Sequence, residues 1–572
     1  MKTLNLHCDF IKFKALKKAL KNIDEIIPNQ KLEGEAKECL VVMIAVEKGD
    51  NKEESVEKLI KNIKDIASQV KTENIVLYPY AHLSRNLGNP GLAIEILNKT
   101  AKDLTGFNVI QAPFGYYKTF ELKVKGHPLS ELAREITIEG NEEVEAELTD
   151  EEQSQLLRQV SKAKLDTSKL KENDHRIIGN KMNLWSFNNV APGMVFWHTK
   201  GLHIKNKLME NWREIHKTEK YEEISTPQIM DKKLWEISGH WRLYKDNNFR
   251  TTYEGRDFLV KPMNCPGGML VYKTSPKSYK DLPLRVGELG VVHRVELSGT
   301  LAGLFRVIQF TQDDAHIFCT QEQLHSEIVG VLNLFIKMLK QFGFDKYKFT
   351  LSTRSKEKAE KYLGDDKTWK KAEDSLTKGL ETLGVKFAKM PGEAKFYGPS
   401  LDVMIEDSLG REWQCSTLQL DFALPPRFDL KYLDKNSKEQ TPIMLHRVVY
   451  GSLERFIGIL TEHLNGNFPL WLSPNQIKVM TLNDDVKEYA KEINQRLFDE
   501  GFMVELDEKN ISMGKKAREA QIQRFNYLVT VGEKEKTEGK IAVRARESKE
   551  IETMTVDEFI SKMKKEVISK KR

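Results

Sequence analysis

Cysteine is scarce in this chain, and its thiols form no pattern of pairs. Among 572 residues there are five cysteines, at positions 8, 39, 265, 319 and 415, widely scattered and odd in number. Secreted domains that depend on disulfide bonds carry many closely spaced cysteines. The sequence therefore argues against a disulfide framework and favours a reducing compartment, which we expect to be the cytoplasm.

Long apolar stretches and an excess of one charge are also absent. No apolar run approaches the ~18 residues needed to span a membrane, and charged residues interrupt the N-terminal segment MKTLNLHCDFIKFKALKKAL too often for a signal peptide. We therefore expect no membrane association. The chain has 90 Lys and Arg against 84 Asp and Glu, a net charge of +6. This mild excess permits a nucleic-acid partner but does not argue for one.

The length of the chain exceeds what one hydrophobic core usually serves, so we expect several domains. Residues 1–137 have the pattern of a small α/β domain, with strand-like runs LNLHCDFIKF, CLVVMIAVE and NIVLYPY and helical apolar spacing over 52–70. Residues 138–174 contain almost no aromatic residues and are interpreted as a helical linker.

The remaining sequence predicts two further domains. Residues 175–472 contain strand-like runs close together, such as EWQCSTLQLDFAL and IMLHRVVY, which predict a mostly antiparallel sheet with helices. In residues 473–572, IKVMTL, FMVELD, YLVTVG and KIAVRAR alternate with helical segments at 484–500 and 513–525. This alternation predicts a βαβ-type domain with a parallel sheet. The whole is thus a multidomain protein of the α/β and α+β classes.

The segment FTQDDAHIFC carries polar side chains at alternate positions. If it is a strand, Gln312, Asp314 and His316 share one face with Phe318. An amide, a carboxylate and an imidazole together are unusual for a core and reasonable for a site.

A metal site is one interpretation of His316. Together with Cys265 and His446 it would form a Cys/His/His set with one open position, which is the pattern of a catalytic zinc. The separations of 51 and 130 residues form no recognisable motif. A hydrogen-bonded core histidine is the common alternative. Cys319 is a rival ligand, but its odd offset from His316 turns it to the other face of the strand.

Basic residues flank a glycine-containing loop in VVHRVELSGTLAGLFRVIQF. Arg294 and Arg306, one on each of two strands, can clamp a triphosphate, and Phe310 could stack on a purine. A hairpin with ordinary surface arginines is equally compatible. Further on, Ser452 and Arg455 are predicted to be neighbours at i,i+3 on a helix.

These segments resemble a known family. HRVE and GSLERFIG resemble motifs 2 and 3 of class II aminoacyl-tRNA synthetases. APGMVFWHTKG, TPQIMDKKLWEISGHW, KPMNCPG, FTQDDAHIFC, FYGP, WQCSTLQLDF and LHRVVYGSLERFIGILTEH resemble the threonyl-tRNA synthetases in order and spacing, over essentially all of 175–572. Residues 1–137, with LHCDFI, LYPYAHLS, APFGYYK and KGHPLSEL, resemble the archaeal-type editing domain of that family, which is similar to D-aminoacyl-tRNA deacylases.

The resemblance implies a threonine–tRNA ligase. It implies a deacylase-like editing domain, an antiparallel class II catalytic core, an α/β anticodon-binding domain and a homodimer. Such an enzyme activates L-threonine with ATP and Mg²⁺, transfers it to tRNA(Thr) and hydrolyses seryl-tRNA(Thr). A synthetase-derived regulator that binds RNA without catalysis, or a separate editing factor, should lack zinc ligands or motif arginines, and both sets are present here.

The resemblance also assigns residues. Zinc, one ion per subunit, is held by Cys265, His316 and His446, and threonine binds it through its amino and hydroxyl groups. The remaining assignments to the synthetic site are Asp314 for the substrate hydroxyl, Tyr397 near the amino group, Arg294 and Gln312 for the carboxylate, Arg294, Arg306, Phe310 and Arg455 for ATP, and Gln414, Gln419 and Ser452 as further active-site residues. Gln414 and Gln419 face opposite ways on a regular strand, so a bulge is expected between them.

The outer domains carry weaker assignments. For editing, the matching residues are His82, Lys118 and Glu131, with Lys118 expected to orient or polarise the ester. For anticodon recognition they are Glu535 and Arg544. The chain departs from the family pattern at Gly268, where histidine is frequent, at Ser400, where a lysine follows YGP, and at Val124, where a cysteine is usual.

Overall fold

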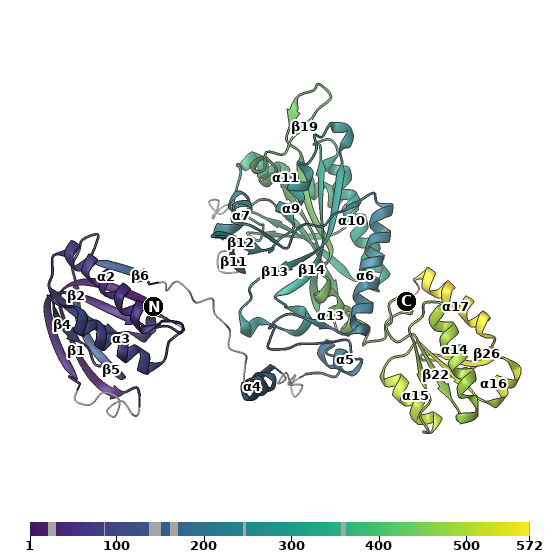
Figure 1. Cartoon of the computed structure of the whole chain (residues 1–572). Coiled ribbons are helices and arrows are strands. Elements are labelled where there is room, and N and C mark those ends of the chain that lie inside the picture. The colour runs from purple at the N-terminus through teal and green to yellow at the C-terminus, as the bar shows by residue number, and fades with distance from the viewer. Residues whose placement is uncertain are drawn as a thin grey trace. The chain divides into compact units, whose positions relative to one another are not determined.

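A computed structural model describes residues 1–20, 30–84, 86–136, 150–160, 170–243, 248–355 and 362–570. Residues 138–149 and 161–169 of the expected linker lie outside these ranges. The chain divides into two compact units, Met1–Glu152 and Gln153–Arg572 (Figure 1). Across the described ranges, no helix is both long and apolar enough to cross a membrane.

The first unit is a six-stranded sheet with helices on one face. Its strand order is β4-β3-β2-β1-β5, with β6 also paired to β1. The elements are β1 (Lys2–Lys18), β2 (Glu33–Ala45), α2 (Lys52–Val70), β3 (Asn74–Pro79), η1 (Ala81–Leu83), α3 (Pro90–Asp103), β4 (Asn108–Gln111), β5 (Tyr116–Val124) and β6 (Glu131–Glu135). The predicted helix over 52–70 is confirmed. Asn51 caps its first turn by accepting a hydrogen bond from the Glu54 amide at 2.9 Å.

The second unit contains a mostly antiparallel eight-stranded sheet, as the sequence predicts. Its order is β16-β15-β17-β18-β21-β14-β13-β9, and the two edge strands β16 and β9 pair in parallel with their neighbours. The strands are β9 (Glu222–Glu223), β13 (Leu284–His293), β14 (Gln309–Cys319), β15 (Tyr347–Thr353), β16 (Phe387–Pro391), β17 (Ser400–Glu406), β18 (Glu412–Asp421) and β21 (Ile443–Ser452).

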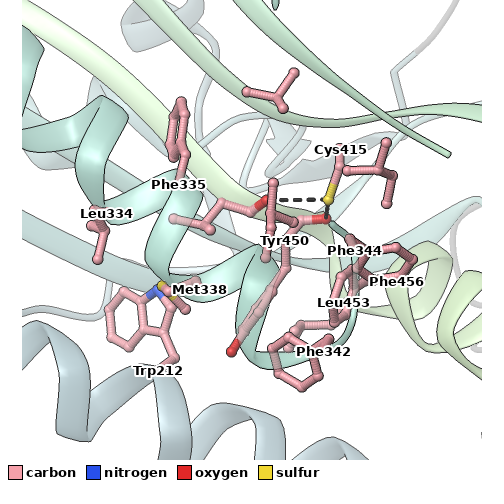
Figure 2. Packing of buried hydrophobic residues seen from close by; sticks show 14 of the residues in the cluster. Trp212, Leu334, Phe335, Met338, Phe342, Phe344, Cys415, Tyr450, Leu453 and Phe456 are labelled. Atoms are coloured by element: carbon pink, nitrogen blue, oxygen red, sulfur yellow. Dashed lines mark hydrogen bonds between the residues drawn. The ribbon is translucent and has the colours of Figure 1, made fainter. Parts of the chain in front are cut away.

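One face of this sheet packs against a large apolar core (Figure 2). The core joins Trp212 of α6 (Thr199–Thr218), Phe335 of α10 (Leu324–Gln341) and Phe456 of α13 (Leu453–His463). From β14, Ile317 and Cys319 belong to the same core. Because side chains alternate along a strand, Gln312, Asp314 and His316 lie on the opposite face. The core therefore fixes which residues of β14 are available for a site.

Further helices and short strands lie outside the eight-stranded sheet. They are α4 (Asp150–Val160), α5 (His175–Lys181), α7 (Lys232–Ser238), α8 (His240–Leu243), α9 (Cys265–Tyr272), α11 (Asp366–Thr382) and α12 (Leu424–Arg427), with the short strands β7 (Trp185–Ser186), β8 (Phe196–Trp197), β10 (Ile229–Asp231), β11 (Arg250–Tyr253), β12 (Arg256–Val260), β19 (Tyr432–Leu433) and β20 (Glu439–Gln440).

The C-terminal part is a five-stranded sheet of order β23-β22-β24-β25-β26. Its elements are β22 (Ile477–Thr481), η7 (Asp484–Val486), α14 (Lys487–Asp499), β23 (Val504–Asp507), α15 (Met513–Ile522), β24 (Tyr527–Val531), α16 (Glu533–Glu538), β25 (Ile541–Ala545), β26 (Glu552–Met554) and α17 (Val556–Ser569).

The expectation of a parallel sheet in this part is half wrong. Strands β22, β23 and β24 are parallel, but β25 and β26 run antiparallel. The connections before β25 and β26 are shorter than the dozen or so residues that a parallel crossover requires. The expected helix over 484–500 is divided into η7 and α14, and the one over 513–525 ends at Ile522.

Candidate functional site

The structure brings Cys265, His316 and His446 together. Cys265 is the first residue of α9, and the two histidines are directly paired across β14 and β21. One ligand atom from each residue lies within 4.8 Å of the other two, and all three residues are buried. Cys319, the rival ligand, belongs to the core on the other face of the sheet. The donor set predicted from the sequence is therefore assembled in the fold.

A carboxylate that sequence reasoning missed holds one of the histidines. Asp421 Oδ2 lies 2.8 Å from His446 Nε2, and its Oδ1 accepts hydrogen bonds from the amides of Ala423 and Leu424 at 2.7 and 2.9 Å. This arrangement leaves Nδ1 of His446 to face an ion, as is typical of ligating histidines. Asp421 is the last residue of β18 and is followed by the apolar run FAL, and a carboxylate in that position was the available signal.

The donor atoms of Cys265, His316 and His446, and the neutral state of His316, suit a zinc ion. Burial and the neighbouring His446 lower the pKa of His316, so its imidazole is neutral and able to ligate. Burial, together with Asp314 and Asp421, raises the pKa of the Cys265 thiol. A bound cation would displace that proton. One thiolate and two imidazoles with an open position fit zinc better than calcium or magnesium, which prefer oxygen ligands.

Asp314 lies beside the histidines in a fixed orientation. Its Oδ1 is 4.0 Å from His316 Nε2, while its Oδ2 accepts a hydrogen bond from Asn264 Nδ2 at 3.2 Å. Asn264 in turn packs against Gly290, where a Cβ atom would lie only 2.1 Å from its Oδ1. The carboxylate is therefore held from behind, with one oxygen toward the metal-binding set.

Asp313, the adjacent residue, lies on the other face of β14 and binds the backbone of β21. Its two oxygens accept hydrogen bonds from the amides of Val449, Tyr450 and Gly451 at 2.9, 3.1 and 2.9 Å. At this point the pairing of β14 with β21 shifts register. The buried carboxylate thus holds the bulge that leads β21 into Ser452, a role that the sequence did not reveal.

A cavity of about 920 Å³ lies beside Cys265, Asp314 and His446. This volume is typical of ligand sites. Of the predicted synthetic-site residues, those that line it are Cys265, Arg294, Arg306, Phe310, Gln312, Asp314, Tyr397, Gln414, Gln419, His446, Ser452 and Arg455. Residues from segments far apart in sequence thus converge on one site.

The expected bulge between Gln414 and Gln419 is confirmed. The pairing of β17 with β18 shifts between Asp402 and Met404, which oppose Thr417 and Gln414. The extra residue on β18 lets both glutamines line the cavity. Tyr397 donates its hydroxyl hydrogen bond to Gln419 Oε1 at 2.6 Å, and Gln414 Nε2 donates to Asp402 Oδ1 at 2.6 Å.

The two arginines expected on strands lie in the connection instead. Arg294 follows β13, and Arg306 follows the 3-10 turn η5 (Gly303–Phe305). Arg294 Nε donates to the Pro262 carbonyl at 3.1 Å, and its guanidinium lies 5.2 Å from the ring centre of Phe310. Arg306 pairs with Glu296 at 2.8 Å. The strands end early because 3-10 turns, including η4 (Ser298–Thr300), occupy the connection.

Arg455 is a partly buried cation at the start of α13. Ser452 is the N-cap of that helix rather than part of it, and its Oγ accepts a hydrogen bond from the Arg455 amide at 3.2 Å. The Arg455 guanidinium lies 5.7 Å from the ring centre of Trp413, and its buried Nε makes no hydrogen bond to the described residues. Burial lowers the pKa of Arg455. A partly buried cation that lines a cavity and has an unsatisfied buried nitrogen indicates an anionic ligand.

In the first unit, Lys118 of β5 carries a partly buried amine that reaches the end of β3. Its Nζ donates to the carbonyls of Pro113 and Pro79 at 3.0 and 3.4 Å and lies 4.9 Å from the ring centre of Tyr78. Burial lowers the pKa of Lys118 to about 8. His82 lies in η1, directly after β3, with its ring 5.3 Å from that of Tyr80.

Glu131 is not brought to Lys118 within one chain. Lys118 pairs with Ala15 of β1, whereas Glu131 pairs with Leu6. Nine residues of extended chain separate these two positions, roughly 30 Å. Val124, the departure from the family pattern, pairs with Cys8 of β1.

The anticodon candidates lie on neighbouring elements of the C-terminal sheet. Glu535 lies in α16, where its Oε2 accepts a hydrogen bond from the Gly532 amide at 3.0 Å and so caps the helix. Arg544 lies on β25 opposite Leu528. The cap gives Glu535 a structural role in addition to any contact with RNA.

Three family models match successive parts of the chain. The archaea-specific editing domain of threonyl-tRNA synthetase matches residues 1–136, the class II core domain of tRNA synthetases (G, H, P, S and T) matches 249–464, and an anticodon binding domain matches 476–566.

Curated relatives match about 70% of the chain. Threonine–tRNA ligase of Caldanaerobacter subterraneus subsp. tengcongensis is 47% identical over 400 residues, which cover 70% of this chain and 61% of that protein. The enzyme of the same name from Desulforapulum autotrophicum is 46% identical over 421 residues, with coverages of 72% and 65%. The chain thus spans about three fifths of the length of these relatives.

Solved structures show the same likeness. A crystal structure of the RNA binding domain of threonyl-tRNA synthetase from Cryptosporidium parvum Iowa II superposes with a TM-score of 0.67 at 39% identity, covering 69% of this chain and 98% of that one. A threonyl-tRNA synthetase from Aeropyrum pernix gives a TM-score of 0.61 at 27% identity, with coverages of 69% and 97%.

Proposed function

This chain belongs to the threonyl-tRNA synthetase family, and we propose that it is an ATP-dependent threonine–tRNA ligase with serine editing. Residues 1–137 would edit, 175–472 would activate threonine and charge tRNA(Thr), and 473–572 would bind the anticodon, with 138–174 as the linker. The observation that carries this proposal is the Cys265, His316 and His446 set. Two of its members, Cys265 and His446, line the same cavity as Arg294 and Arg455.

The metal-binding set gives the proposed enzyme its substrate recognition. Zinc held by Cys265, His316 and His446 would coordinate the amino and hydroxyl groups of threonine. Asp314, oriented by Asn264, accepts the hydrogen of the substrate hydroxyl. Valine lacks that hydroxyl and would leave a buried carboxylate unsatisfied, so discrimination of ~10⁴ or more is expected.

Activation requires position and charge rather than a general base. The threonine carboxylate attacks the α-phosphate of ATP in line, and pyrophosphate leaves. Arg294, Arg306 and Arg455 compensate the charge on the phosphates, together with Mg²⁺ brought by ATP. Phe310 would carry the adenine on the ring face that Arg294 does not cover. The adenylate then passes its threonyl group to the terminal ribose of the tRNA.

Serine explains why a second hydrolytic site is needed. It keeps the hydroxyl that the synthetic site recognises and lacks only a methyl group. The loss of one methyl group is worth only about 1–3 kcal/mol, too little for faithful translation. The N-terminal unit would therefore remove serine from tRNA(Thr). By the same resemblance, the working form would be a cytoplasmic homodimer with one zinc ion per subunit.

Charging of tRNA tests the proposal directly. The protein is incubated with ATP, Mg²⁺, tRNA(Thr) and one amino acid at a time. The expected product is threonyl-tRNA, without accumulation of seryl- or valyl-tRNA. Absence of threonyl-tRNA from zinc-replete protein would reject the ligase assignment.

Replacement of Lys118 by alanine should separate editing from synthesis. Because the amine lies on the other unit from the synthetic cavity, threonyl-tRNA formation should persist, while hydrolysis of seryl-tRNA(Thr) slows roughly tenfold or more. Lys123→Ala is the matched control, since Lys123 lies on the same strand and pairs with Asp9 at the surface. Equal rates of seryl-tRNA hydrolysis in the two variants would remove Lys118 from the proposed site.

The pH dependence of editing should reveal the charge of Lys118. Its pKa, lowered to about 8, means that the ammonium loses its proton as pH rises through 8. If the ammonium polarises the ester, the ratio of hydrolysis rates, native chain over Lys118→Ala, falls between pH 7 and pH 9. This ratio also cancels the uncatalysed hydrolysis that hydroxide causes. A ratio that rises over the same interval would show that the neutral amine acts, as a base.

A further inference from the structure

A second group of polar residues lies outside the metal-binding set and has no role in the proposed reaction. Asp174, His175 and Glu462 place their side-chain atoms within 4.8 Å of one another. Their hydrogen-bonding atoms are already engaged. His175 Nδ1 lies 2.7 Å from Glu462 Oε1, His175 Nε2 lies 3.0 Å from the Leu304 amide nitrogen, and Asp174 binds Arg176 through both oxygens. This group is a hydrogen-bonded node rather than a metal site.

The chemistry of the node fixes the tautomer of His175. Burial raises the pKa of Glu462, but hydrogen bonds from His175 and Arg411 outweigh it and leave that pKa below its ordinary value. An ionised carboxylate can only accept hydrogen bonds, so Nδ1 of His175 must donate. With its proton on Nδ1, the neutral ring presents Nε2 as an acceptor, and the Leu304 amide donates to it. Glu462 thus determines that His175 can hold this backbone amide.

The amide that His175 holds belongs to the connection that carries Arg294 and Arg306. Leu304 is the middle residue of η5. Gly303 beside it has φ +54, and a Cβ there would lie 2.3 Å from His175 Nε2, so this close approach requires glycine. The anchored turn ends with Phe305 and is followed directly by Arg306, and both residues line the cavity.

Aromatic contacts carry the effect of the anchor to the cavity wall. The ring of Phe305 lies 4.2 Å from that of His175 and 4.5 Å from that of Trp413. Trp413 lies under the guanidinium of Arg455. Trp413 also donates from Nε1 to Asp407 at 2.9 Å, and Asp407 is held by Arg411, which reaches Glu462 at 2.6 Å. The node therefore connects α5 and α13 with the walls of the proposed ATP site.

We propose that His175 is a positioning residue for ATP, which holds the Leu304 amide so that Phe305 and Arg306 face the nucleotide. This inference rests on the proposed function. His175 is buried and does not line the cavity, so it acts through the connection and not by contact with substrate. Threonine binds at the metal-binding set, which the node does not touch, so the effect should concern ATP and not the amino acid.

Replacing His175 by asparagine or by glutamine distinguishes the effect of its hydrogen bond to Leu304 from the effect of losing a buried ring. In His175→Asn the amide nitrogen can take the place of Nδ1 and keep the bond to Glu462, but nothing reaches the Leu304 amide. In His175→Gln the longer side chain places its amide oxygen near the Nε2 position and keeps the acceptor for Leu304. Each variant loses about one buried hydrogen bond, so their midpoints of thermal unfolding should be similar.

Pyrophosphate exchange in the full chain then measures KM for each substrate. His175→Asn should raise KM for ATP about tenfold with KM for threonine nearly unchanged, since one hydrogen bond is lost, whereas His175→Gln should restore KM for ATP to nearly its original value. Equal KM values for ATP in the two variants, or a rise in KM for threonine instead, would overturn the inference. If His175→Asn does not fold, Gly303→Ala, whose Cβ would push the turn away from His175, must raise KM for ATP. Absence of exchange in the unaltered chain would count against the proposed function itself.

Discussion

Replacement of Cys265 by alanine will lower threonine-dependent pyrophosphate exchange by about three orders of magnitude, because loss of a ligand of the proposed zinc ion removes several kcal/mol of binding and orientation. The variant should also lose its zinc, measured as metal content of the purified protein. His316 and His446 alone cannot hold the ion in the arrangement that an amino acid must complete.

Cys319→Ala is the matched control for this prediction. Both cysteines are buried in the same unit, and Cys319 is only three residues from His316, but it belongs to the apolar core on the other face of β14. This variant should lose some stability and keep both its zinc and its exchange activity. Retention of full exchange by Cys265→Ala, or an equal loss in both variants, would contradict the metal assignment.

The second large effect is expected for Asp314, and the adjacent Asp313 provides its control. Asp314→Asn should lower kcat/KM for threonine about 10²-fold and leave the slow reaction with valine almost unchanged. The reason is that the amide replaces one carboxylate oxygen by an NH₂ group, which would face either the NH₂ group of Asn264 or the substrate hydroxyl, so one of the two hydrogen bonds to this side chain loses its acceptor. Selectivity for threonine over valine therefore narrows by the same factor, as exchange assays with each amino acid would show.

Asp313→Asn serves as the comparison, since it makes the same chemical change one residue away. Its side chain accepts three backbone hydrogen bonds, and an amide would place N–H groups against N–H groups. We expect it to destabilise the fold by about 3 kcal/mol and to lower the midpoint of thermal unfolding, with selectivity for threonine retained. If Asp313→Asn changed selectivity as much as Asp314→Asn does, the assignment of substrate recognition to Asp314 and of structural support to Asp313 would be wrong.

Much of the site follows from the sequence because its residues lie in strands with clear alternation. The shared face of Gln312, Asp314 and His316 and the exclusion of Cys319 need only the two-residue period of a strand. The bulge between Gln414 and Gln419 follows from the same period, because two residues five apart cannot face one cavity without it. These predictions depend on local geometry, which the sequence encodes directly.

The rest depends on pairing between distant strands. His316 and His446 are direct neighbours only because β14 and β21 pair in one register, and that register includes a shift that Asp313 holds open. Nothing periodic in the sequence marks it. Likewise, Arg294 and Arg306 lie beyond the strand ends because tertiary contacts such as the one between His175 and Leu304 favour turns there.

The supporting residues were missed for a related reason. Asp421 and Asn264 are single polar residues beside apolar ones, a pattern that also describes many ordinary core positions, and His175 stands in the polar run NDHR, which resembles an ordinary surface segment. Their partners lie up to 287 residues away, as for His175 and Glu462. Only the folded structure shows that each one orients a residue of the site. The separation of Glu131 from Lys118 became visible in the same way, through the register of β1.

Pyrophosphate exchange by the zinc-replete chain with threonine, serine and valine, each alone and without tRNA, tests the central claim most directly. We predict rapid exchange with threonine, slower but clear exchange with serine, which keeps the hydroxyl, and exchange with valine lower than with threonine by ~10⁴. No exchange with threonine, or equal exchange with threonine and valine, would contradict a site in which the metal-binding set and Asp314 recognise the hydroxyl group.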